Sequence, residues 1–119
     1  MAKVYVVQAP ARRSGPNGDW VEKYDLSAAE RFGELVRVLP YGNVPTSSES
    51  TSGALWQALR GFDFSSDYVL LLGDPVAIAR AIHVLCQKQA IREETGDFAT
   101  IRALKWDRRL EAYAPYEIG

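Results

Sequence analysis

The segment that most restricts the fold is the apolar run Tyr68–Leu72, which is followed at once by Gly73, Asp74 and Pro75. A continuous apolar run of this length is typical of a strand buried on both faces, as the central strands of parallel sheets are. Asp74 is a favourable helix N-cap, and Pro75 takes the first helical position, where its missing N–H has no consequence. The segment therefore predicts a central parallel strand that leads directly into a helix.

Two further strands are expected before this run. The β-branched and aromatic residues of segment 3–8 predict the first strand, and segment 35–39 predicts the second. Between them, the prolines and glycines of residues 9–25 interrupt any periodic pattern, so we expect a loop there.

Helices are expected over 27–34 and 52–61. Ser27 and Glu30 have the spacing of a capping box, in which each side chain bonds the other residue's amide. The second helix follows a polar loop predicted over 42–52. Its apolar residues form an amphipathic stripe consisting of Leu55, Trp56, Leu59 and Phe62.

Beyond the helix expected over 75–90, the apolar pattern changes to a period of two. Residues 100–106 and 110–118 then predict two strands joined by a turn at Asp107–Arg109. Pro115 places the last strand at the edge of the sheet, because a residue without an N–H is tolerated there.

In chain order these elements give βαβαβαββ. Strands that alternate with helices imply right-handed crossovers, a mostly parallel sheet and helices on both faces. We therefore predict a three-layer α/β fold, Rossmann-like or flavodoxin-like. Its mixed, mostly parallel five-stranded sheet has the spatial order 2-1-3-4-5 and ends in a C-terminal antiparallel hairpin. Because no linker divides the chain, residues 1–119 are expected to form a single domain.

The charge composition argues against a nucleic-acid partner. The chain has 14 basic and 15 acidic residues and a net charge of −1, whereas non-specific duplex binding needs a basic face. The single cysteine excludes an internal disulfide framework. No apolar run approaches 18 residues, so we expect no membrane contact and a cytoplasmic location.

A ligand site is predicted where the strand order reverses, between the first and third strands. Ligands of open α/β sheets bind beyond the carboxyl ends of the strands at such a point. Arg12 and Arg13 of the first loop and Gly73 and Asp74 of the turn would meet there, and could hold a small anion or a nucleotide. The competing interpretation is structural: Gly73 permits a tight turn, and Asp74 caps the helix with its own carboxylate.

No motif predicts catalysis. The dinucleotide pattern G-x-G-x-x-G, the phosphate-binding loop and the nucleophile elbow are absent, so we expect no catalytic residue, cofactor or metal. Cys86 is interpreted as a small buried hydrophobe, and His83 as a helix-surface or half-buried residue. Enzymatic activity stays open but is not favoured.

The tryptophans and tyrosines exceed what one small core needs, and exposed residues of these types commonly anchor interfaces. The final hairpin is the predicted interface for a protein partner or a second copy, through Trp106, Arg108, Arg109, Tyr113 and Tyr116. The competing interpretation is that Trp106 and Tyr113 form an ordinary stabilising pair across the two strands.

Three segments resemble small proteins of tailed bacteriophages. Asp25–Glu34 follows the pattern D-x-S-A-A-x-x-F/Y-G-E, Asp67–Pro75 follows D-Y-x-L-x-x-G-x-P, and Ile101–Arg108 opens the final hairpin. Over roughly residues 24–118 the chain is similar to phage-encoded accessory proteins. The resemblance implies a non-enzymatic protein made in an infected cell that acts on a host or viral macromolecule, and it transfers no site residue. The alternative is a nucleotide-binding or small-anion-binding α/β protein, or an enzyme, that uses the crevice between strands 1 and 3.

Overall fold

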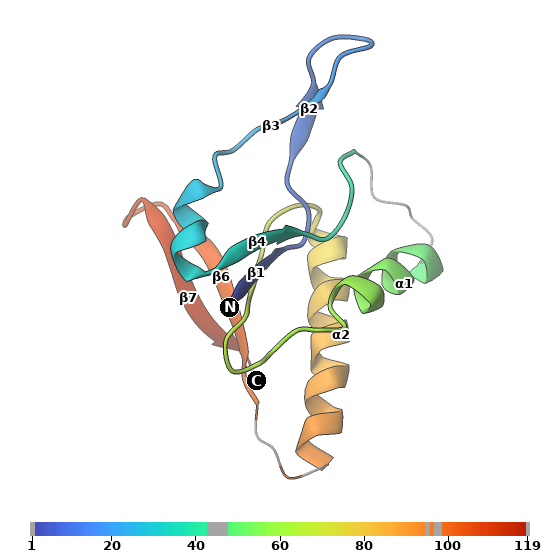
Figure 1. Cartoon of the computed structure of the whole chain (residues 1–119), viewed down its shortest axis with the longest axis vertical. Coiled ribbons are helices and arrows are strands. Elements are labelled where there is room, and N and C mark those ends of the chain that lie inside the picture. Colours follow the sequence, from blue (N-terminus) through green and yellow to red (C-terminus); the bar gives the residue numbers. More distant parts are fainter. Residues whose placement is uncertain (1, 43–47, 95, 97–98, 119) are drawn as a thin grey trace.

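The computed structural model describes residues 2–42, 48–94, 96 and 99–118, and its main sheet has five strands in the order β4-β1-β5-β6-β7 (Figure 1). The strands span Lys3–Val6 (β1), Glu34–Arg37 (β4), Tyr68–Leu70 (β5), Ile101–Asp107 (β6) and Ala112–Ile118 (β7). All neighbours pair in parallel except β6 and β7, which form an antiparallel hairpin. The predicted strand order, the mostly parallel sheet and the terminal hairpin are confirmed.

The predicted loop over 9–25 is wrong in part, because it contains a second, smaller hairpin. Strands β2 (Ala11–Arg13) and β3 (Trp20–Glu22) pair antiparallel with each other and with no other strand of the described ranges. This projecting hairpin extends away from the main sheet (Figure 1). Each strand has only three residues, too few for an alternating pattern to be recognised in the sequence. The element order therefore departs from βαβαβαββ.

The capping box predicted for Ser27 and Glu30 does not form. The helix of the first crossover is a 3₁₀ helix, η1 (Ser27–Phe32), without a side-chain hydrogen bond at its cap. The Ser27 amide donates to Asp25 Oδ1 at 2.9 Å instead. Because that amide is the group that Glu30 would have to reach, the local Asp25 turn replaces the capping box.

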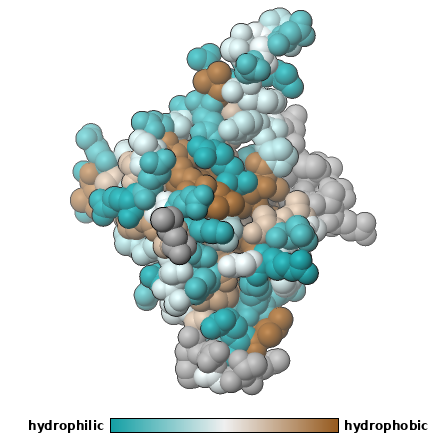
Figure 2. Space-filling view, viewed as in Figure 1, coloured by the Kyte–Doolittle hydropathy of each residue, from teal (hydrophilic) through white to brown (hydrophobic). Residues whose placement is uncertain are grey.

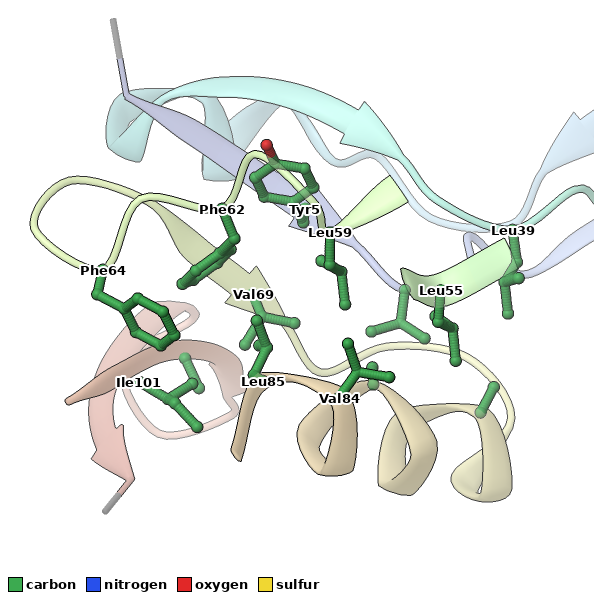
Figure 3. Packing of buried hydrophobic residues seen from close by; sticks show 14 residues of the cluster. Tyr5, Leu39, Leu55, Leu59, Phe62, Phe64, Val69, Val84, Leu85 and Ile101 are labelled. Atoms are coloured by element: carbon green, nitrogen blue, oxygen red, sulfur yellow. The ribbon is translucent and has the colours of Figure 1, made fainter. Parts of the chain in front are cut away.

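One face of the sheet is covered by α1 (Ser48–Ala58) and α2 (Pro75–Glu94). Figure 3 shows Leu85 of α2 and Leu59, which directly follows α1, near Val69 of the central strand, and Leu55 of α1 in the same packed layer. These four side chains are at most 1% exposed. Burial of each such side chain contributes on the order of 2 kcal/mol, so this layer is the main apolar core.

The predictions for α1 need correction at its ends and at Trp56. The helix begins at Ser48, inside the loop predicted over 42–52, of which residues 43–47 lie outside the described residues. Trp56 was predicted on the buried stripe and is 39% exposed. It follows Leu55 directly, and consecutive helical residues point about 100° apart.

The prediction that Cys86 is buried is also wrong, because this residue is exposed on α2. Its neighbour Leu85 is fully buried, so the same angular offset turns Cys86 away from the sheet. His83 is exposed, which agrees with its predicted place on the helix surface.

The opposite face of the sheet is covered by η1 and the segment before it. Leu26 and Ala29 are buried there against Val4, Leu70 and Leu104 of three different strands. A single short helix covers less of a sheet than two longer ones. The carboxyl ends of β5 and β6 consequently remain partly open on this face.

Candidate functional site

A cleft of about 610 Å³ lies at the carboxyl ends of β5 and β6. Its volume is within the range of roughly 300–1,000 Å³ that is typical of ligand pockets. We call it the hairpin cleft, because its residues come from the β6–β7 hairpin, the end of β5 and the segment before η1: Tyr24, Asp25, Leu70, Leu71, Leu72, Lys105, Trp106, Arg108 and Tyr113.

The aromatic wall of the hairpin cleft is a cross-strand pair. Trp106 and Tyr113 are register partners in β6 and β7, and their ring centroids lie 5.1 Å apart in an edge-to-face arrangement. Tyr113 is 7% exposed, whereas Trp106 is 45% exposed. The predicted stabilising pair is thus confirmed, and it leaves Trp106 as the accessible aromatic surface.

Asp25 sets the electrostatics at one part of the cleft. The hydrogen bond from the Ser27 amide lowers the pKa of Asp25 below the ordinary aspartate value. Burial, followed by the nearby charge of Asp25, raises the pKa of Tyr113. At neutral pH the cleft therefore contains an ionised carboxylate and a protonated phenol.

Three cations lie in or beside the hairpin cleft: Lys105, Arg108 and Arg109. Among the described residues, none of their side chains forms an ion pair or a hydrogen bond. The nearby acid Asp107 already accepts hydrogen bonds from the amides of residues 109 and 110, at 2.8 and 3.2 Å. The three cationic groups are consequently available to an anionic partner.

The structure brings three of the five predicted interface residues into the hairpin cleft, namely Trp106, Arg108 and Tyr113. Arg109 is exposed in the adjoining turn. Tyr116 is 47% exposed and lies on the other face of β7, because residues three apart in a strand point to opposite faces. The predicted interface is therefore divided between two faces of one hairpin.

The other half of the cleft was not predicted; it is formed by Tyr24, Asp25, the leucines 70–72 and Lys105. These residues belong to three separate segments, so no local spacing relates them. Tyr24, which is 58% exposed, carries the only usable signal: an aromatic residue in a polar, glycine-containing segment.

Both predicted ligand residues of the turn after β5 have a structural role. Gly73 has a φ of +112°, and a Cβ at this position would lie 2.7 Å from the Cβ of Gln8, so glycine is required. Asp74 caps α2, as predicted, by accepting the amides of residues 76 and 77 at 2.8 and 3.2 Å. The Gln8 side chain donates to two carbonyl oxygens of the loop after β4, at 3.1 and 2.8 Å.

Arg12 and Arg13, the other predicted ligand residues, lie in β2 of the projecting hairpin and are exposed. The Arg13 guanidinium is 4.7 Å from the centre of the Trp20 ring, which is a cation–π contact. Within the described part of the chain, no hydrogen bond or ion pair joins either arginine to Gly73 or Asp74. The anion site formed by these four residues stays a prediction.

The projecting hairpin is held at its base by Glu22. Its carboxylate accepts hydrogen bonds from Arg37 Nε and Nη2 at 2.7 and 2.9 Å, and from the Tyr41 hydroxyl at 2.8 Å. The bond from Arg37 lowers the pKa of Glu22 and raises that of Arg37. In Figure 2 the surface of this hairpin, at the top of the view, is mostly hydrophilic.

The described residues contain no group of three or more histidine, cysteine, aspartate or glutamate side chains arranged to hold a metal ion. Over the same ranges, every helix is too short or too polar to cross a membrane. The hairpin cleft is the candidate site because it combines an aromatic wall with cations that are unpaired within the described residues.

Comparison with known proteins agrees with the bacteriophage resemblance. The family model of the Phage Pam3 gp32-like protein matches residues 2–119. The match includes the first long segment, which the resemblance over 24–118 left out. No curated protein and no solved structure matches the chain.

Proposed function

The chain belongs to the Phage Pam3 gp32-like protein family, and from this premise we propose that it is a small accessory protein that acts by binding another protein in the host cytoplasm. The observation that carries the proposal is the exposed Trp106 beside unpaired cations at an open cleft. Tryptophan, tyrosine and arginine are the residues most enriched at the energetic centres of interfaces.

The outer edge of β7 supports the same function. Within the described residues this strand pairs only with β6, so backbone donors and acceptors on its other side, apart from Pro115, which has no N–H, are free to pair with a partner strand or a second copy. Tyr116 would lose solvent exposure in such a contact, while Arg109 in the turn would form part of a polar rim. The β6–β7 hairpin thus offers both a backbone edge and side-chain anchors.

The strand order bears on the fold class. The order β4-β1-β5-β6-β7 corresponds to the flavodoxin-like order 2-1-3-4-5, and we propose a Rossmann-like, three-layer arrangement in which η1 takes the place of the first crossover helix. The alternative function is a nucleotide or small anion bound at the crevice between β1 and β5. It has less support, because the Asp74 carboxylate already accepts the first free amides of α2.

Two peripheral variants test protein binding. Tyr116→Ala and Arg109→Glu should each weaken association at least fivefold, which corresponds to about 1 kcal/mol, with little change in melting temperature. Sedimentation measures self-association, and quantitative pull-down from phage-infected cells measures partner binding. Arg60→Glu, which changes an exposed arginine just after α1, is the matched charge control and should change neither. If both test variants associate as the unmodified chain does, the β6–β7 hairpin is not the interface.

A further inference from the structure

We infer that the hairpin cleft binds an acidic peptide segment of the partner, with one bulky apolar side chain seated in the cleft and flanking carboxylates paired with Lys105 and Arg108. The inference rests on the proposed protein binding and extends it to the chemistry of the partner. The inference is supported by the apolar lining of the cleft, by its cations, which are unpaired within the described residues, and by its location at the β6–β7 hairpin.

The apolar part of the cleft suits an inserted side chain. Leu71 and Leu72 follow β5 and remain half-buried, although each packs against a core cluster. Trp106 and Tyr24 add aromatic surface that is about half exposed, at 45% and 58%. An apolar side chain placed there would remove accessible surface of all four residues from water, which is the main favourable contribution to association.

The charged part of the cleft specifies an anionic partner. Lys105 and Arg108 have no ion pair within the described ranges, whereas Asp25 and Asp107 already accept backbone amides. A carboxylate brought to the two cations would therefore not compete with an existing pair. The negative charge of Asp25 would keep the partner's carboxylates on the side of the cleft that holds Lys105 and Arg108.

A peptide fits these observations better than a single-stranded nucleic acid, which is also anionic and aromatic. Nucleic-acid grooves combine stacking platforms with a continuous track of cations along the backbone. The cleft has two cations, Arg109 adds a third in the adjoining turn, and the net charge of the chain is −1. The cations are thus confined to one cleft, which suits a short acidic peptide better than an extended phosphate backbone.

Binding of capped synthetic peptides tests the inference. The probe is acetyl-DDFDD-amide, titrated into the full chain and followed by calorimetry and by the indole NMR signal of Trp106. We expect it to bind at least fivefold more tightly than acetyl-DDADD-amide, which lacks the apolar side chain, and acetyl-KKFKK-amide, which reverses the charge. Affinity should fall as salt rises, because the ion pairs are near the surface.

Substitutions in the chain test whether the DDFDD peptide binds in the hairpin cleft. Arg108→Glu and Tyr24→Ala change exposed residues of the cleft and should each weaken DDFDD binding at least fivefold without lowering the melting temperature. Arg60→Glu, which changes an exposed arginine just after α1, is the matched charge control and should bind the probe normally. Absence of DDFDD binding at about 10 mM, equal binding of the three peptides, or full binding by Arg108→Glu would overturn the inference. Tighter binding of an eight-nucleotide thymidine oligomer would overturn it in favour of nucleic acid.

The two proposals fail in different ways. If Tyr116→Ala and Arg109→Glu weaken association but DDFDD does not bind, protein binding stands and the acidic-peptide inference is wrong. If DDFDD binds in the cleft but neither variant alters association, the β6–β7 interface is wrong and the cleft is a peptide site by itself.

Discussion

The two hairpins of this protein combine similar side chains, yet they are attached to the molecule in different ways. In the projecting hairpin, Trp20 contacts Arg13, and its ring lies 6.0 Å from that of Tyr41. In the β6–β7 hairpin, Trp106 packs against Tyr113. Both therefore place a tryptophan in an aromatic pair, and both have arginines nearby.

The attachments differ in kind. The strands of the β6–β7 hairpin have seven residues each, and β6 joins the main sheet through β5, with Ile101 and Leu104 fully buried. The projecting hairpin has three-residue strands and is attached through the Glu22 hydrogen bonds to Arg37 and Tyr41 and the ring contact of Trp20 with Tyr41. Apolar burial couples the first hairpin to global stability, whereas these partly exposed contacts let the second open independently.

The largest expected effect is from Leu104→Ala. Removal of this fully buried side chain should lower the free energy of unfolding by about 2–5 kcal/mol, measured by urea denaturation. Val21→Ala in the projecting hairpin, where the side chain is 47% exposed, should change it by less than about 0.5 kcal/mol. Equal losses in the two variants would show that the projecting hairpin belongs to the same cooperative core.

Glu22→Gln should release the projecting hairpin without unfolding the sheet. The amide of Lys23, which donates to the Pro10 carbonyl at 2.8 Å, should exchange its hydrogen about fivefold faster. This corresponds to about 1 kcal/mol, the usual contribution of a partly exposed, charge-assisted contact. Amides of β6 should exchange as before. Glu30→Gln, which changes an exposed glutamate in η1, is the matched control, and an equal acceleration in it would refute the role of Glu22.

Acid should reproduce the effect of Glu22→Gln. The hydrogen bond from Arg37 lowers the pKa of Glu22 in the folded chain below its unfolded value. Its stabilising contribution is therefore complete above the ordinary glutamate range and disappears as the pH falls through the lowered pKa. The difference in Lys23 protection factor between the unmodified chain and Glu22→Gln should be constant near pH 7 and vanish in acid. A difference that persists to the lowest pH at which the chain is folded would contradict this assignment.

The smallest expected effect concerns the two turns. Glu111, in the β6–β7 turn, has a φ of +49°, which is unfavourable for a residue with a side chain, whereas the projecting hairpin has glycine at its positive-φ position, Gly15. Glu111→Gly should raise the melting temperature slightly. The gain in the free energy of unfolding should be no more than about 1 kcal/mol, because the greater freedom of the unfolded chain offsets part of it. Glu111→Ala keeps the strain and should show no such gain.

The same contrast explains how far the sequence predicts this fold. The run Tyr68–Leu72 and the alternating residues after 100 identify the central and terminal strands, because burial on one or both faces leaves a periodic pattern. The projecting hairpin leaves none, since its stability depends on Glu22 meeting Arg37, which is 15 residues away. Pairings of this kind depend on the completed sheet, and neither residue differs from an ordinary surface charge in the sequence.

The candidate site was predicted only in part for a related reason. Trp106, Arg108 and Tyr113 belong to one hairpin, and their spacing across a turn predicts that they lie together. Tyr24 and Asp25 reach the same cleft because η1 follows them closely and packs on the sheet face where Leu70 is buried. Their place depends on which face the short crossover covers, a property that local pattern does not determine.

Pro115 is the fourth of the seven residues of β7 and is exposed at the edge of the sheet. Two copies that aligned these edges antiparallel about the middle of the strand would set proline opposite proline, where neither backbone donates a hydrogen bond. An incoming strand finds uninterrupted pairing over only three residues on either side. Propagation of the sheet from molecule to molecule is thereby disfavoured, which protects the chain from fibrous aggregation at high concentration.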